Sequence, residues 1–442
     1  MVRQLFIAFL AGVFLMAPAV AGAEERVEVV ALVPDEGERI VFGGRTYAGV
    51  ITVRATNGVL VVTEVVDLDG YLGGIREVPF SWPEEALEAQ AVAARTYLAW
   101  TLNRGRAGNG ARYGFDICAT TACQVYAGTG LVDRPSGEPW LDAVAATAGE
   151  ILIYDGSPAQ TLYSSSSGPR TRSVEDIWGG TPKPYLVAVD SAEEDATPYW
   201  QWSVELPVDA VTRILAEDGY RVGGDIREVE VQQTEDGGGI WRLAVETERG
   251  SVAVPNTTVR NAFNRHGTTL YPGLLPANRP TGGTWPQAIL SYTFDVELLA
   301  PDGPSLPAPL IALLPPDDTP EDAVVVFEGT GWGHGVGMSQ WGAKAMADQG
   351  FTHEEILAHY YGGLEPETSD EFVPDDVVVG LGWGGLEETF AATGVFELWA
   401  NGVRVDAFGP GEWTMRLLSN GIAVIPPAGV SDPRLGNRRW PR

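Results

Sequence analysis

The chain has 442 residues, 45% of them hydrophobic, and a formal net charge of −30 at pH 7. This length allows about two or three domains and supplies enough apolar residues for a sizeable core. The negative charge argues against a nucleic-acid partner or an anionic membrane surface, because binding to phosphates requires clustered Lys and Arg side chains.

The chain begins with the pattern of a secretory signal peptide. Met1-Val2-Arg3 is a short positive start, an apolar run covers residues 5–20, and Ala21-Gly22-Ala23 is a small-residue cleavage site. An uncleaved anchor is the alternative interpretation. From the cleavage site we expect residues 1–23 to be removed. No later run reaches the length of a membrane span, so we expect the mature protein to be secreted or periplasmic.

The first part of the mature chain predicts strands followed by one long helix. Short β-rich runs are separated by Gly, Asp and Asn, at residues 26–33, 39–41, 49–55 and 59–66. The helix is predicted to have Ser81 as N-cap, Pro83 in its first turn and Glu84 completing a capping box, and to end near Leu102. Its apolar residues occupy more than one face, which indicates a buried helix.

The middle of the chain alternates between β-like runs and loops. A small-residue helix over 141–147 ends before Gly149 and leads into a strand at 151–154. Residues 164–169, a serine run followed by Gly and Pro, predict a loop. The Pro-rich stretches 272–286 and 301–320 predict surface loops or linkers. Further strands are predicted at residues 202–205, 226–232, 241–246, 251–254 and 289–296.

A glycine-rich segment comes next. Glycine occupies every second position of residues 329–337, which excludes an ordinary helix there. A helix is predicted over 340–349, and another begins after Thr352, an N-cap with Glu355 as its capping-box partner. The tail returns to β-like runs, for example at residues 395–405 and 422–425, and predicts a small appended β-region.

Cys118 and Cys123 are the only cysteines. Disulfides persist outside the cytoplasm, so a small-loop disulfide between these residues is the default prediction. Two cysteines five positions apart do not by themselves indicate a zinc site, which requires four ligands.

Four motifs, in order along the chain, resemble the SpoIID/LytB family, named for the stage II sporulation protein D and the amidase enhancer. They are Glu77-Val78-Pro79 with residues 82–97, the segment 116–126 that contains both cysteines, the serine loop leading to residues 176–180, and residues 331–343. The resemblance spans roughly residues 26–365. It implies a SpoIID-like domain over residues 24–365 and a β-rich extension over 366–442.

The family resemblance implies an α+β fold, with mixed β-sheets and a few buried helices around a groove that binds glycan. It also implies peptidoglycan glycan strands as the ligand and an N-acetylmuramoyl-L-alanine amidase as a possible partner. SpoIID-type members are lytic transglycosylases that cut glycan strands stripped of stem peptides. LytB-type members are named for modifying the action of an amidase.

The glutamate of the family's Glu-x-Pro motif falls on Glu77. A lytic transglycosylase can work with one carboxyl group, because the muramic sugar's own primary hydroxyl closes onto the anomeric carbon. The acid first protonates the leaving oxygen and then accepts the proton of that hydroxyl. We expect Val78, Phe80 and Trp82 to give this acid a partly apolar setting. A solvated loop acid is the alternative for Glu77, and Glu85 is the second choice for the catalytic acid.

The other matched residues have weaker assignments. Ser165 and Ser167 are candidates for hydrogen bonding to glycan and Trp178 for stacking on it, with loop architecture as the equal alternative. His334 is either a substrate-contacting residue or a histidine bonded to loop main chain, and Gln340 is a further substrate-binding candidate. For the family-matched residues of the long helix we expect structural roles, and these are Gln90, Arg95 and Tyr97.

Two positions depart from the family pattern. Ala122 stands where sporulation-type members have a histidine beside the cysteines that can bind zinc, and Ser164 stands where many relatives have a histidine. We therefore expect no metal and no other cofactor. These departures keep open a non-catalytic module that binds wall glycan and stimulates an amidase, or a purely structural envelope protein.

Overall fold

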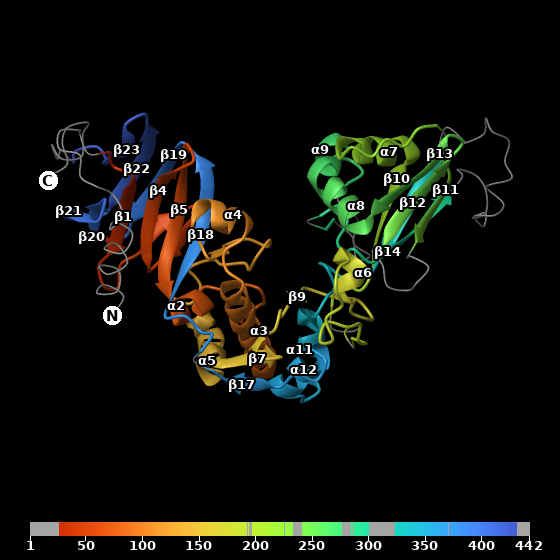
Figure 1. Cartoon of the computed structure of the whole chain (residues 1–442), viewed down its shortest axis with the longest axis horizontal. Helices are drawn as coiled ribbons and strands as arrows, with labels where there is room; N and C mark the ends of the chain where they lie inside the picture. The colour runs from red at the N-terminus through yellow and green to blue at the C-terminus, as the bar shows by residue number, and fades with distance from the viewer. Residues whose placement is uncertain are drawn as a thin grey trace. The chain divides into compact units, whose positions relative to one another are not determined.

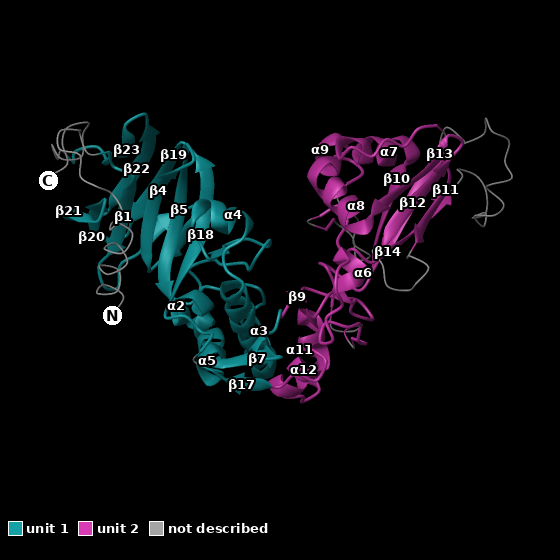
Figure 2. Cartoon of the chain, in the orientation of Figure 1, with its two compact units in different colours: residues 1–160, 366–442 teal, residues 161–365 magenta. Residues whose placement is uncertain are grey.

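The computed structural model describes residues 26–191, 193, 197–224, 226–232, 241–275, 284–285, 287–299, 323–369 and 371–430. The expected signal peptide and the Pro-rich stretch 301–320 lie outside these residues. The chain forms two compact units (Figure 2): unit 1 contains residues 1–160 and 366–442, and unit 2 contains residues 161–365. Mixed sheets and helices confirm the predicted α+β class.

Unit 1 is organised around a seven-stranded sheet (Figure 1). Its strands are β1 (Val29–Pro34), β4 (Val50–Thr56), β5 (Val59–Asp67), β6 (Ile117–Cys118), β18 (Asp376–Gly385), β20 (Phe396–Ala400) and β21 (Val403–Phe408). They lie in the order β21-β20-β1-β4-β5-β18-β6, antiparallel except for the β18–β6 pair.

Two smaller sheets complete the β-structure of unit 1. One has the order β23-β22-β19-β2-β3, and the other has the order β17-β7-β8. The strands of the first are β2 (Ile40–Phe42), β3 (Arg45–Tyr47), β19 (Glu387–Ala392), β22 (Gly411–Leu418) and β23 (Gly421–Ile425). Those of the second are β7 (Glu150–Tyr154), β8 (Ser157–Pro158) and β17 (Pro366–Thr368).

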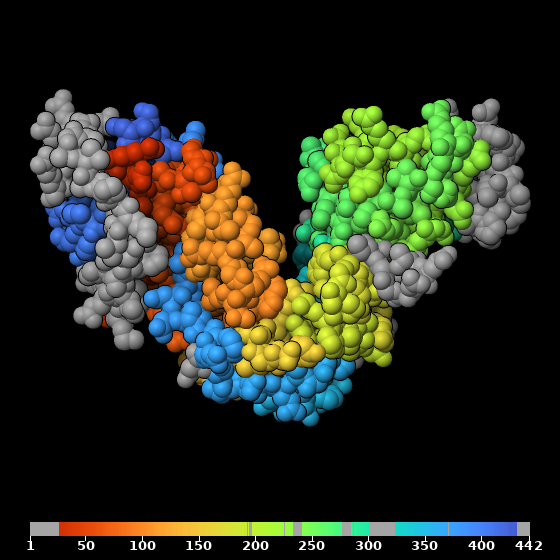
Figure 3. Space-filling model, in the orientation of Figure 1, coloured from red at the N-terminus to blue at the C-terminus, as the bar shows by residue number. Residues whose placement is uncertain are grey.

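The tail is an integral part of unit 1 rather than an appended β-region. Strand β18 pairs with β5, β20 pairs with β1, and β19 pairs with β2. In the space-filling view the blue tail lies directly against the red N-terminal strands (Figure 3). Unit 2 is therefore an insertion between two parts of unit 1.

The helices of unit 1 are α2 (Leu68–Gly73), α3 (Glu84–Asn103), α4 (Gly108–Tyr113) and α5 (Glu138–Ala146), with a 3-10 turn at Pro135–Gly137. Helix α3 is buried along most of its length, and its residues Leu87, Ala91, Ala94 and Leu98 share one core with β4 and β5. This burial agrees with the predicted second packing face.

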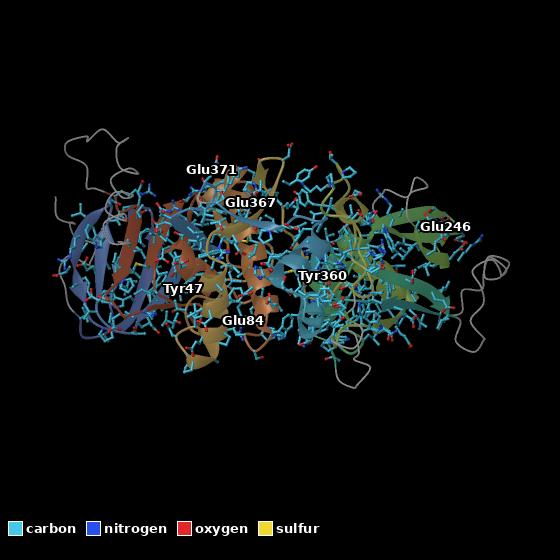
Figure 4. All side chains as sticks on the ribbon, turned by 90° about the horizontal axis from the view of Figure 1, so that it is seen from below. Tyr47, Glu84, Glu246, Tyr360, Glu367 and Glu371 are labelled. Carbon is cyan, nitrogen blue, oxygen red and sulfur yellow. A yellow bond between two sulfur atoms is a disulfide. The ribbon has the colours of Figure 1, made fainter. Side chains whose placement is uncertain are left out.

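The predicted start of α3 was wrong. Pro83 is the N-cap, its carbonyl accepts the N–H groups of Ala86 and Leu87, and no side chain caps this end of the helix. A residue that precedes proline avoids the helical conformation, so Trp82 cannot be the first helical residue and Ser81 cannot be its cap. Glu84 is instead an exposed acid in the first turn (labelled in Figure 4).

The described residues of unit 2 form three small sheets. One has the order β10-β15-β14, another β11-β12-β13, and β9 pairs in parallel with β16. The strands are β9 (Tyr163–Ser164), β10 (Trp202–Pro207), β11 (Ile226–Gln232), β12 (Arg242–Thr247), β13 (Gly250–Pro255), β14 (Phe294–Leu299), β15 (Val324–Gly329) and β16 (Met338–Ser339). The helices are α6 (Val174–Trp178), α7 (Val208–Glu217), α8 (Asn256–Ala262), α9 (Thr268–Leu270), α11 (Gln340–Asp348) and α12 (His353–Tyr360), with a π-helical turn at Phe263–Gly267.

Two predictions in unit 2 have opposite outcomes. Thr352 and Glu355 form the predicted capping box of α12, which is confirmed. The strand predicted over 289–296 begins only at Phe294. Before that point the side chain of Asn264 bonds the main chain of residues 288 and 289, and takes the place of a neighbouring strand. None of the helices within the described residues is long and apolar enough to cross a membrane.

Candidate functional site

Glu77 lies in unit 1, in the irregular segment between α2 and α3. Apolar neighbours anchor this segment in the core. Val78 is buried, Trp82 packs against the same core, and the ring of Phe80 stacks on that of the buried Trp140 with centroids 5.6 Å apart and an interplanar angle of 4°. These contacts fix the main chain from which the Glu77 side chain projects.

The half-buried Glu77 carboxylate is held by the main chain of a second segment. The N–H of Val125 donates to Glu77 Oε1 at 2.6 Å, and the N–H of Arg76 donates to the Val125 carbonyl at 2.8 Å. A main-chain N–H bond to a carboxylate favours its ionised form. The surroundings of this acid are therefore not purely apolar, because an anion-stabilising donor lies beside it.

A buried polar network lies behind this contact. The Tyr71 hydroxyl donates to Gln124 Oε1 at 2.7 Å, and the Tyr126 hydroxyl donates to Glu64 Oε2 at 2.7 Å. Burial raises the pKa of Glu64 to about 7, against the lowering effect of the bonds from Tyr126 and Gly49. Glu64 was not among the residues predicted from the sequence, although one charged residue inside the apolar run of β5 was a visible signal.

The residues expected to be structural lie on α3. Arg95 is buried, and its guanidinium donates to the carbonyls of Val144 and Glu150, both at 3.1 Å. Gln90 is also buried, while Tyr97 is half-buried and its ring lies 5.6 Å from that of Trp100.

Glu85, the second choice for the acid, is half-buried on the first turn of α3, at the start of the helix that follows the Glu77 segment. Acids on the first turn of a helix interact favourably with its dipole, which gives Glu85 a structural reason for its position.

Cys118 and Cys123 form a disulfide, with their Cα atoms 5.5 Å apart. This is the disulfide predicted from the sequence. The disulfide uses both thiols, so neither sulfur is available as a metal ligand. Ala122 is exposed beside it and offers no ligand atom.

In unit 2 the serine loop packs against the glycine-rich segment. Ser166 and Trp332 exchange main-chain hydrogen bonds of 3.1 and 2.8 Å. Gly333 has φ +117°, and a Cβ there would lie 2.7 Å from Cβ of Ser164. Glycine is required at this position because of both the positive φ and the close approach, so the repeated glycines have a packing role.

His334 lies in this contact, and its ring is hydrogen-bonded to loop main chain. Nδ1 accepts the N–H of Val336 at 3.0 Å. Burial is the largest cause that lowers the pKa of His334, to about 4, with a smaller effect from Arg260. His334 is therefore neutral near pH 7. Of the two alternatives open from the sequence, this geometry favours the histidine bonded to main chain.

The serine candidates divide by exposure. Ser167 is buried, and its N–H and hydroxyl donate to Glu193 Oε1 at 2.8 and 3.1 Å. The hydroxyl of Ser339 donates to Glu193 Oε2 at 2.8 Å. Burial raises the pKa of Glu193 to about 7 despite these donors. The Ser167 hydroxyl is thus occupied within the protein, whereas Ser165 is half-buried.

Trp178 is the most exposed of the candidate glycan contacts. Its side chain is 43% exposed, and its ring centroid lies 5.3 Å from that of His334. An exposed indole fixed beside a neutral imidazole offers a face for stacking on a sugar ring. Gln340 is buried at the first turn of α11 and presents no comparable surface. Glu77 belongs to unit 1, and these candidates belong to unit 2.

Residues 56–154 match the family model SpoIID, described as a stage II sporulation protein. The matched residues include Glu77, all of α3 and the disulfide. The SpoIID/LytB resemblance is confirmed. We refer to residues 56–154 as the SpoIID segment.

Individual relatives agree with this match. An uncharacterised protein of Brachyspira hyodysenteriae is 27% identical over 343 residues, covering 76% of this chain and 77% of that protein. The amidase enhancer of Bacillus subtilis is 27% identical over 65% of this chain, but the match covers only 38% of the enhancer. Stage II sporulation protein D of Bacillus amyloliquefaciens is 26% identical, covering 70% of this chain and 77% of that protein.

Proposed function

We propose that this protein acts on the bacterial cell wall as a lytic transglycosylase, cleaving peptidoglycan glycan strands with Glu77 as acid and then base. The observation that carries the proposal is the fixed Glu77 carboxylate, held by the Val125 N–H at 2.6 Å within the SpoIID segment. The family match and the names of the relatives support the cell-wall role. The N-terminal signal pattern is that of an exported protein, and export would bring it to the compartment that holds glycan strands.

In the proposed reaction, protonated Glu77 gives its proton to the glycosidic oxygen between muramic acid and glucosamine. The bond from that oxygen to the muramic anomeric carbon breaks. The primary hydroxyl of the same muramic sugar then attacks the anomeric carbon, and the Glu77 carboxylate accepts its proton. The Val125 N–H stabilises the carboxylate that must form after the first step.

The test compares the protein lacking residues 1–23 with its Glu77→Gln variant on stem-free glycan strands, with products identified by mass. We expect anhydromuramic ends from the wild type and none from Glu77→Gln. Glu84→Gln is the matched control, because Glu84 is an exposed first-turn acid nearby. A Glu85→Gln variant distinguishes the two candidate acids, since activity lost there and kept in Glu77→Gln would reassign the acid. If the wild-type protein yields no anhydromuramic ends, the proposed transglycosylase activity is refuted.

A non-catalytic glycan-binding protein that enhances an amidase is the second candidate. One observation favours it: the Val125 N–H donates to Glu77 Oε1, and such a bond supports the ionised form, whereas the first step needs the protonated form. The relative named amidase enhancer points the same way. This candidate predicts strand binding without cleavage, and faster amidase digestion of cell walls when the protein is added. Binding that is equal in Glu77→Gln and wild type would support it further.

A further inference from the structure

A fully buried acid lies within the seven-stranded sheet of unit 1. Glu64 is on β5, and an ionisable side chain in such a place is costly unless its oxygens are bonded. Its Oε1 accepts the N–H of Gly49 at 2.8 Å, and its Oε2 accepts the Tyr126 hydroxyl at 2.7 Å. A Cβ on Gly49 would lie 2.8 Å from Oε1, so the glycine just before β4 leaves room for this carboxyl group.

Tyr126 links that acid to the segment that precedes Glu77. Its buried ring stacks on Tyr71, with centroids 5.3 Å apart and an interplanar angle of 16°. A Cβ on Gly74 would lie 2.2 Å from the Tyr126 ring, and the N–H of Ala127 donates to the Gly74 carbonyl at 2.8 Å. The segment before Glu77 therefore rests directly on the tyrosine.

Both neighbours of Val125 are anchored in this way. On one side is Tyr126. On the other, Gln124 accepts the Tyr71 hydroxyl at 2.7 Å and donates to the Ala94 carbonyl at 3.2 Å. The residue between them donates its N–H to Glu77 Oε1 at 2.6 Å. The direction of that N–H is thus set by buried bonds on either side of it.

We propose that Glu64 and Tyr126 are positioning residues, whose mutual hydrogen bond holds the Val125 N–H on the Glu77 carboxylate. Neither residue contacts the reacting atoms. Buried, fully bonded polar groups fix one arrangement of the chain, and a small displacement of a catalytic group lowers the rate. The consequence for catalysis rests on the proposed function of Glu77, but the positioning itself does not.

The primary test measures proton exchange of the Val125 amide by NMR in the wild type and in Tyr126→Phe. The amide is identified by comparing the spectra of wild type and Glu77→Gln, in which its chemical shift should move because its acceptor changes. We expect the Val125 amide to exchange about tenfold faster in Tyr126→Phe, from the loss of one buried hydrogen bond. The Val62 amide of β5 is the reference for this comparison. Tyr360→Phe is the matched control, because its hydroxyl bonds Ser191 at 2.9 Å in unit 2, and it should leave the exchange of Val125 unchanged.

Two substitutions of Glu64 guard against a merely unfolded variant. Glu64→Gln keeps an oxygen acceptor, so its Val125 amide should exchange at a rate within about twofold of the wild type. In Glu64→Leu the Val125 amide should exchange as fast as in Tyr126→Phe. Equal exchange of Val125 in wild type, Tyr126→Phe and Glu64→Leu would overturn the proposal.

Cleavage of stem-free strands gives a second, separate measurement. If the wild type cuts, Tyr126→Phe should lower kcat about tenfold with KM unchanged, as expected for a displaced catalytic group. An unchanged kcat beside faster exchange would overturn the catalytic consequence. If the wild type does not cut, the proposed function fails, and the exchange measurement still decides the positioning.

Discussion

Glu64→Gln should change how the stability of unit 1 depends on pH. Burial raises the pKa of Glu64 from the ordinary 4.5 to about 7 in the folded protein. The folded state therefore keeps its proton between pH 4.5 and 7 while the unfolded chain loses its own. Stability from this group is complete below pH 4.5 and is lost as the pH rises towards 7. A rise of this size corresponds to about 3 kcal/mol of lost stability at pH 8.

Gln is similar in size and does not titrate, so it should abolish this loss. At pH 8 we expect Glu64→Gln to raise the free energy of unfolding of unit 1 by up to about 3 kcal/mol, with little change at pH 4. Urea titrations at both values measure this, and the transition that responds identifies unit 1. Glu193 titrates in the same range in unit 2, so the comparison is between wild type and variant. If the free energy of unfolding changes equally between pH 4 and pH 8 in both proteins, the pKa of Glu64 is not raised by folding.

Three further predictions concern Arg95, the disulfide and Trp178. Arg95→Met should destabilise unit 1 by about 3 kcal/mol in urea, because one buried and one part-buried carbonyl lose their donors, and a loss under about 1 kcal/mol would contradict the role assigned to Arg95. Replacing Cys118 and Cys123 by Ser should cost about 2 kcal/mol, the loop-closure entropy of a short loop, and unchanged stability would argue against that account. Trp178→Ala should weaken binding of glycan oligosaccharides about tenfold in a fluorescence titration, through lost stacking, and unaltered affinity would remove Trp178 from the site.

Local signals predicted local structure well. The capping box of α12 follows from Thr352 and Glu355 alone. The failure at Ser81 has a local cause too, since Pro83 excludes the helical conformation one residue before it. The β-like run 395–405 contains a hairpin that turns at Asn401-Gly402, both with positive φ. An Asn-Gly pair flanked by apolar residues was available as a turn signal.

Long-range structure was not accessible in the same way. The pairing of β18 with β5 joins residues more than 300 positions apart, and no feature of either strand specifies its partner. Glu64 stood out in an apolar run, but Glu193 lies in an acidic stretch where nothing distinguishes it from its neighbours. Only the folded arrangement shows that serine donors surround one of those acids.

In the proposed reaction, the bond from Val125 to Glu77 bears differently on the two steps. The Val125 N–H supports the carboxylate, which is the form that accepts a proton in the second step. The apolar side chains of Val78, Phe80 and Trp82 are directed into the core and fix the main chain, so they do little to favour the protonated acid. A bound glycan that excludes water from the half-buried carboxyl group would supply that missing effect, because desolvation favours the neutral form. Binding of the glycan strand and the acid strength of Glu77 are then coupled. A glycan too short to cover Glu77 should bind to the protein but should not be cleaved.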